Sequence, residues 1–107
     1  MSACGSDSKN PKQASGPRLS AKDNKGVAGI GQDVSTYCYK GGAHANVERA
    51  VEELLTAYRA HPTAIFRAST GTESTMREVV TAVAQQLETC DERALARKLR
   101  TELTKAG

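Results

Sequence analysis

The sequence predicts an all-α protein: a small three-helix bundle, made of an antiparallel helical hairpin and a C-terminal helix, behind a disordered N-terminal tether. Apolar residues recur at helical spacing in three segments after residue 44, whereas residues 1–34 are mostly polar and show no sustained periodicity. The chain has 107 residues, of which 38% are hydrophobic and one is Phe, so it can build one small aliphatic core. We therefore expect a tether over residues 1–34 and a helical domain over residues 35–107.

The predicted tether carries the basic excess of the chain. Residues 1–26 hold five Lys or Arg side chains against two Asp, whereas residues 41–107 hold nine basic and nine acidic side chains. Such a polar stretch buries too little apolar surface to offset the entropy cost of ordering it. The glycines of the segment Gly26–Gly31 are not spaced like those of a phosphate-binding loop, and no predicted strand precedes them. We interpret this segment as a glycine-rich linker.

The first predicted helix lies between residue 44 and Pro62. His44 or Asn46 marks its beginning, and Pro62 ends it because the residue before a proline disfavours helical dihedral angles. Six apolar residues share one face of this helix over three turns: Val47, Ala50, Val51, Leu54, Leu55 and Tyr58. This stripe predicts an amphipathic helix that is buried along one side.

The second predicted helix follows an extended connection. In this connection, residues 63–70, we expect Ile65 and Phe66 to fold back on the core. Thr75 with Glu78 three residues later is typical of a capping box and marks the start of the helix. The apolar face that follows consists of Met76, Val79, Val80, Val83, Leu87 and Cys90.

The third predicted helix begins after Asp91, a favourable N-cap residue. Leucines then recur at four-residue steps: Leu95, Leu99 and Leu103. Amphipathic helices joined by short links bury their apolar faces against each other. We therefore expect the first two helices to be antiparallel neighbours, with the third packed against them.

The expected topology brings two of the three cysteines together. Cys38 lies shortly before the first predicted helix and Cys90 ends the second, so antiparallel packing places them at the same end of the bundle. A disulfide between them closes a loop of about 53 residues. The entropy that such a loop removes from the unfolded chain stabilises the fold by about 4 kcal/mol. Disulfides persist outside the cytosol. The alternative is that all three cysteines are free thiols in a cytosolic protein, with Cys90 serving as an apolar residue of a helix face.

No combination of residues indicates catalysis or metal binding. The candidates for a nucleophile and its base are pairs of one cysteine and one histidine, drawn from Cys38, Cys90, His44 and His61. No third group that could orient such a base lies at a recognisable spacing. The same four residues lack the closely spaced ligand pairs of structural zinc sites. We therefore expect no catalytic residue, no cofactor and no metal site.

A basic face on the third predicted helix is a candidate contact surface. Arg93, Arg97 and Arg100 share it, which makes them a possible contact for an anion such as an acidic phospholipid or a cell-wall polymer. We favour a solvated helix face, because acidic side chains interleave and the helix dipole favours cations near a C-terminus. Nucleic acid is not an expected partner, since the folded part is neutral and this helix has no aromatic side chain to stack on bases.

The N-terminus resembles the lipobox of bacterial lipoproteins, the pattern Leu-Ser/Ala-Ala/Gly-Cys. Ser2, Ala3 and Cys4 match its last three positions, and Met1 stands where the family has Leu. In that family the cysteine carries the lipid and becomes the first residue of the mature protein. The resemblance implies lipidation of Cys4, and we expect an apolar signal segment to be encoded upstream of Met1. Lipidation also leaves one pair of cysteines for the disulfide.

The overall organisation is similar to that of short secreted lipoproteins of high-GC Gram-positive bacteria, which have a lipobox cysteine, a polar tether and a small helical domain with two cysteines. The resemblance implies an extracytoplasmic protein held to the cell membrane by its lipid anchor, and it implies no substrate. We expect a non-catalytic, envelope-anchored helical module that binds an envelope polymer or protein, or has a structural role. The alternative is a cytoplasmic helical adaptor or nucleic-acid-associated protein whose basic tail orders on its partner.

Overall fold

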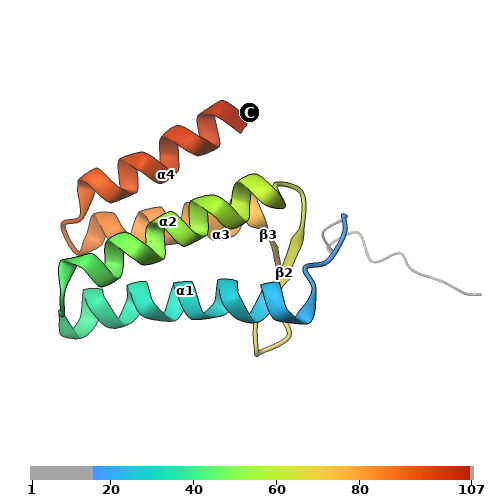
Figure 1. Ribbon diagram of the computed structural model, residues 1–107, viewed down its shortest axis with the longest axis horizontal. Coiled ribbons are helices and arrows are strands. Elements are labelled where there is room, and N and C mark those ends of the chain that lie inside the picture. The colour runs from blue at the N-terminus through green and yellow to red at the C-terminus, as the bar shows by residue number, and fades with distance from the viewer. Residues whose placement is uncertain (1–15, 107) are drawn as a thin grey trace, which may run out of the picture.

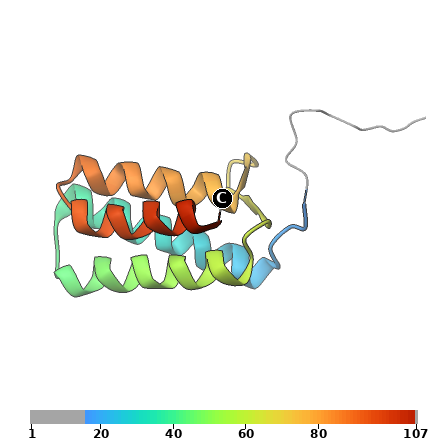
Figure 2. The same ribbon diagram turned by 90° about the horizontal axis from the view of Figure 1, so that it is seen from above.

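The structure, a computed structural model, describes residues 16–106, and this part of the chain forms four helices and a two-stranded antiparallel sheet. In chain order the elements are α1 (Ala21–Lys40), α2 (His44–Ala60), β2 (Ile65–Arg67), β3 (Glu73–Thr75), α3 (Met76–Thr89) and α4 (Arg93–Ala106). Figures 1 and 2 show α1 antiparallel to α2, and α3 antiparallel to α4. The predicted all-α class is correct in outline. The bundle has four helices rather than three, and a short sheet connects α2 to α3.

Helix α1 contradicts the predicted tether over residues 1–34. From Ala21 onward the chain is helical, and the segment Gly26–Gly31 lies inside this helix rather than in a linker. Three aliphatic residues of α1 are buried in the core: Val27, Ile30 and Val34. The predicted domain start at residue 35 is therefore wrong, because α1 belongs to the folded domain. Residues 1–15 of the predicted tether lie outside the described residues.

Helix α1 forms because both of its ends are capped and one face is apolar. The Ser20 hydroxyl accepts a hydrogen bond from the backbone N–H of Asp23 (3.1 Å), and the Asp23 carboxylate places negative charge in the first turn. At the other end, Gly41 adopts a φ of 82°, a conformation that favours glycine, and its N–H donates to the carbonyl of Tyr37 (2.8 Å). The three buried aliphatic residues lie three and four positions apart, so a narrow stripe faces the core.

Helices α2 and α3 confirm their predicted patterns. All six residues of the predicted α2 stripe are buried, and Pro62 follows soon after the helix ends at Ala60. The predicted capping box at the start of α3 is present. The Thr75 hydroxyl accepts from the N–H of Glu78 (3.0 Å), and the Glu78 carboxylate accepts from the N–H of Thr75 (2.8 Å).

The turn between α3 and α4 differs from the prediction. Asp91, the predicted N-cap of the third helix, follows the C-cap of α3 and has a φ of 71°. The N–H of Asp91 donates to the carbonyl of Glu88 (3.3 Å), and the N–H of Glu92 donates to that of Leu87 (2.8 Å). These two bonds form a Schellman motif, in which a residue in the left-handed region ends the helix. Helix α4 begins only at Arg93, because Asp91 reverses the chain direction instead of starting a helix.

The connection between α2 and α3 is more ordered than the extended stretch predicted for it. Strands β2 and β3 pair with Ile65 opposite Thr75. As predicted, Ile65 is buried and Phe66 packs against the core. The segment before α1 lies beside β2, because the N–H of Leu19 donates to the carbonyl of Ile65 (3.0 Å) and the N–H of Ile65 donates to that of Pro17 (2.8 Å).

The bundle has two chemically different ends (Figures 1 and 2). The turn end holds the α1–α2 link, residues 41–43, and the α3–α4 turn, residues 90–92. The hairpin end holds the sheet and the segment that leads into α1. Asn24 joins these two parts, since its side-chain amide donates to the carbonyl of Arg67 (2.7 Å) and its side-chain oxygen accepts from the N–H of Arg67 (2.8 Å). The mostly aliphatic core extends between the two ends.

We predict that Gly26→Ala raises the free energy of unfolding by about 0.5–1 kcal/mol. Gly26 is helical and exposed, and a Cβ added there would have no atom within 4 Å. The alanine therefore restricts the unfolded chain without a clash in the folded one. Urea denaturation followed by circular dichroism measures the change.

Gly16→Ala is the matched control for this substitution. Gly16 has a φ of +134°, and a Cβ there would lie 2.6 Å from the carbonyl oxygen of Thr63, so alanine at this position should destabilise the domain. A loss of stability in Gly26→Ala would contradict the open environment that the structure gives to this glycine.

Candidate functional site

A disulfide joins α1 to α3 at the turn end. Cys38 lies in the last turns of α1, Cys90 is the C-cap of α3, and their Cα atoms are 5.3 Å apart, within the range that a disulfide bridges. As predicted, the two cysteines lie at disulfide distance, although Cys38 lies inside a helix rather than before one. Since the two sulfur atoms are bonded to each other, neither is available as a thiolate nucleophile or as a zinc ligand.

Four side chains beside the disulfide form what we call the turn-end cluster: Tyr37, His44, Glu48 and Glu92. The Glu92 carboxylate accepts a hydrogen bond from the Tyr37 hydroxyl (2.6 Å) and lies 3.0 Å from Nε2 of His44. Nδ1 of His44 lies 3.6 Å from the Glu48 carboxylate. The rings of Tyr37 and His44 meet edge to face, with centroids 6.3 Å apart. The cluster thus connects α1, α2 and the α3–α4 turn.

The contacts of the turn-end cluster shift the pKa values of its members. The hydrogen bond with Glu92 raises the pKa of His44, and the nearby carboxylate of Glu48 adds to this effect. The hydrogen bond from Tyr37 lowers the pKa of Glu92, as does the contact with His44. These shifts favour a pair of charged groups, an imidazolium and a carboxylate, that holds three segments together.

The two histidines lie at opposite ends of α2. His44 is the first residue of this helix, and His61 is its C-cap at the hairpin end. Nε2 of His61 lies 3.4 Å from the carboxylate of Asp23. Sequence reasoning did not identify Tyr37 and Glu92 as partners of His44. No spacing rule connects them, because Tyr37 and Glu92 are 55 positions apart and meet only in the folded bundle.

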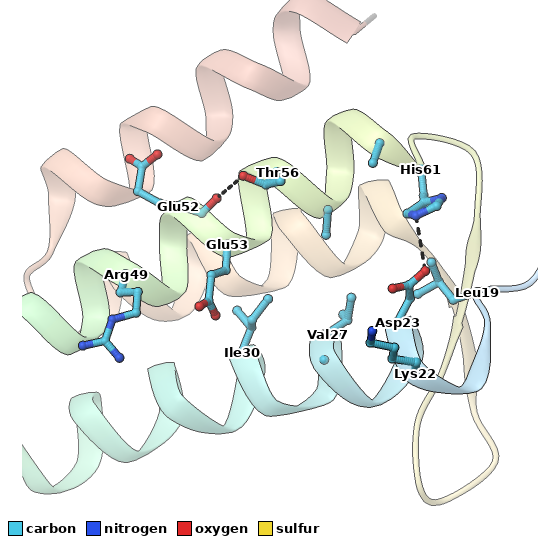
Figure 3. A pocket seen from close by; sticks show the side chains of 13 residues that line it. Leu19, Lys22, Asp23, Val27, Ile30, Arg49, Glu52, Glu53, Thr56 and His61 are labelled. Carbon is cyan, nitrogen blue, oxygen red and sulfur yellow. Dashed lines mark hydrogen bonds and ion pairs between the residues drawn. The ribbon is translucent and has the colours of Figure 1, made fainter.

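An open groove of about 530 Å³ runs between α1 and α2 (Figure 3). Its apolar lining comes from Leu19, Val27, Ile30, Ala57 and Ala60. Its charged lining has both signs and comes from Lys22, Asp23, Arg49, Glu52 and Glu53. Glu52 is directed toward α4, where Nζ of Lys98 donates to its carboxylate (2.7 Å), so Glu52 and Glu53 do not converge on a common point. The groove can provide apolar contact flanked by charges of both signs.

The basic face of α4 is largely neutralised. Arg93, Arg97 and Arg100 line one depression of about 500 Å³, together with Glu88. The Arg100 guanidinium donates two hydrogen bonds to the Glu88 carboxylate (2.7 and 2.9 Å), and Nε of Arg93 lies 3.7 Å from Asp91. The three arginines are thus brought together as expected, but two of them have carboxylate partners. Anion contact at this face stays a prediction.

Two further features of the described part of the chain concern metal binding and membrane crossing. Within residues 16–106, no group of three or more His, Cys, Asp or Glu side chains is placed to hold a metal ion. None of the helices in that range combines the length and the apolar character needed to cross a membrane. Cys4, the predicted lipidation site, lies outside the described residues.

Comparison with protein-family models, with curated proteins and with solved structures gives no match to this chain.

The turn-end cluster predicts a stability maximum at mildly acidic pH. The pKa of His44 is raised above its ordinary value of about 6.5, so its stabilising effect is complete below that pH and is lost as the pH rises through the raised value. The pKa of Glu92 is lowered, so its effect is complete above about pH 4.5 and is lost as the pH falls through the lowered value. Thermal unfolding measured from pH 2 to pH 9 should show both losses.

Three variants test whether the loss of stability at alkaline pH comes from the contact between His44 and Glu92. His44→Asn and Glu92→Gln should flatten the fall in the melting temperature above about pH 6.5, because each removes one partner of the main hydrogen bond. Glu48→Gln is the control and should keep most of that fall, since the main cause of the raised pKa of His44 is Glu92. An unchanged slope in His44→Asn would show that another group titrates.

The disulfide should contribute substantially to stability. The double variant Cys38→Ser with Cys90→Ser should lose about 2–5 kcal/mol of unfolding free energy, because its unfolded chain regains the entropy of a long closed loop. Urea denaturation of the variant, of the wild type and of the wild type reduced with dithiothreitol measures this loss. The double variant and the reduced wild type should unfold at similar urea concentrations. Equal stability of oxidised and reduced protein would contradict a stabilising role for the bond.

Proposed function

We propose that this protein is a non-catalytic helical module of the bacterial envelope, held to the cell membrane by a lipid on Cys4, with a binding or structural role toward an envelope polymer or protein. The observation that carries the proposal is the bond between Cys38 and Cys90. Disulfides persist in extracytoplasmic compartments and are rare in the cytosol. The lipobox-like segment Ser2-Ala3-Cys4 supports the same compartment independently of the fold.

The proposed anchor determines how far the domain extends from the membrane. A lipobox cysteine carries a diacyl group, and two acyl chains give stable attachment where a single chain is marginal. Gly16, the first described residue, lies twelve positions after Cys4. At full extension this stretch spans at most about 43 Å. The domain of a lipidated chain therefore stays within a few nanometres of the lipid surface.

A binding or structural role is supported by the way the reactive side chains are engaged. Cys38 and Cys90 are bonded to each other, and the imidazoles of His44 and His61 lie against carboxylates. The disulfide thus leaves neither cysteine available as a thiolate nucleophile that one of these imidazoles could activate. The α1–α2 groove, with its apolar lining and flanking charges, instead gives the module a surface for contact with another molecule.

Cell fractionation of the gene expressed with its own upstream codons tests the anchor. We expect the wild-type protein in the membrane fraction and Cys4→Ser in the soluble extracytoplasmic fraction, because the serine cannot carry the thioether-linked lipid. The matched control is Ser6→Ala, which leaves the cysteine in place and should stay with the membrane. If wild type and Cys4→Ser are both soluble inside the cell, the proposal fails and the cytoplasmic adaptor is the better description.

A further inference from the structure

We propose that a basic hollow at the hairpin end binds the phosphate groups of anionic phospholipids. The hairpin end of the folded domain then contacts the membrane surface. The hollow is formed around three cations from three segments of the chain: Arg18, Lys25 and Arg67. This inference rests on the proposed function only in that a membrane must be within reach. It adds a second contact, made by the folded domain itself.

The hollow has the shape and the lining for shallow contact with a headgroup layer. It has a volume of about 550 Å³ and is lined by residues from the start of α1 and from strand β2. Its apolar lining includes Leu19, Ala28 and Ile65. Within the described residues, no carboxylate lines it. Apolar side chains surrounded by cations suit a surface that presents phosphate groups above hydrocarbon.

The backbone around the hollow is held in place by hydrogen bonds that do not use its cations. The side-chain amide of Asn24 pairs with both backbone groups of Arg67, which fixes β2 against α1 and leaves the guanidinium outside this contact. On the other side, the N–H of Leu19 donates to the carbonyl of Ile65. The positions of the cations are therefore set by main-chain contacts. Substitution of the Lys25 and Arg67 side chains should leave the fold intact.

The charge around the hollow is only partly compensated. Nε of Arg18 donates to the Glu73 carboxylate (2.6 Å), and the same contact lowers the pKa of Glu73. Among the described residues, Lys25 and Arg67 form no ion pair within 4.0 Å, although Arg67 lies opposite Glu73 in the sheet and its charge also lowers the pKa of that carboxyl. The depression on α4 differs in its lining, because the Glu88 carboxylate lies among its arginines. The hairpin end thus offers net positive charge, which an anionic surface attracts.

The position of the hollow along the chain also favours the membrane as its partner. Gly16 lies at the same end of the bundle, so a lipid on Cys4 attaches the chain closer to this end than to the turn end. Lys9 and Lys12 lie in the intervening sequence and add to the basic charge there. The turn end, in contrast, carries Asp91 and Glu92 in the α3–α4 turn.

Vesicle sedimentation with the unlipidated full chain, Cys4→Ser, tests the inference without help from the anchor. We expect this protein to bind phosphatidylglycerol vesicles, to bind phosphatidylcholine vesicles at least about tenfold more weakly, and to lose affinity as salt is raised. Adding Lys25→Gln and Arg67→Gln should reduce binding to the anionic vesicles by about tenfold or more. The conservative pair Lys25→Arg with Arg67→Lys should retain binding.

The matched control is Arg93→Gln with Arg97→Gln, which removes the same charge from α4 and should change binding by less than about twofold. An equal loss in this control, or no binding to anionic vesicles, would overturn the inference. So would tighter binding to a DNA oligonucleotide than to the vesicles. The thermal unfolding of each variant is measured to confirm that it folds. Vesicle binding and cell fractionation are independent measurements. A failure of vesicle binding leaves the proposed lipid anchor standing, and a failure of the anchor in fractionation leaves the proposed phospholipid contact standing.

Discussion

The Cys38–Cys90 disulfide holds the weakest helix of the bundle in place. Helix α1 contains three interior glycines, each of which costs about 0.5–1 kcal/mol relative to alanine, and it buries only three aliphatic side chains at low exposure. The covalent bond fixes its C-terminal end to α3, while Asn24 fixes its N-terminal end to β2. The α1–α2 groove, the turn-end cluster and the basic hollow all have one side formed by α1. Each of them therefore depends on the two attachments of this helix.

The elements that sequence reasoning identified correctly are those in which local signals agree. Helix α2 has an apolar residue at every turn, and α3 adds a complete capping box, so their boundaries follow from short-range patterns. Helix α1 was not predicted because its stripe is diluted by Gly26 and Gly29, and because its stability comes from contacts with other segments. Asp91 was misassigned for another reason. Aspartate suits an N-cap and also tolerates the left-handed region, and a spacing pattern does not distinguish the two uses.

The same distinction applies to the sites. The cysteine pair followed from the expected antiparallel packing of α2 and α3. That packing places Cys38, which precedes α2, beside Cys90 at the end of α3. The turn-end cluster and the basic hollow combine side chains from distant segments. Arg18 and Glu73 are 55 positions apart, as are Tyr37 and Glu92, and both pairs require the geometry of α1. With α1 assigned to a tether, neither site could be found from the sequence.

The position of the disulfide also determines how the domain responds to tension. In a chain anchored at Cys4 and held by a partner through α4, the load enters along α1, reaches Cys38 and crosses the sulfur–sulfur bond to Cys90. The intervening segment, with a sequence separation of 52 between the cysteines, lies outside this path. Helices α2 and α3 and the sheet cannot be drawn out while the bond is intact. The chain can therefore lengthen only through the residues before Cys38 and after Cys90, and a pulled molecule stops extending well short of its full contour length.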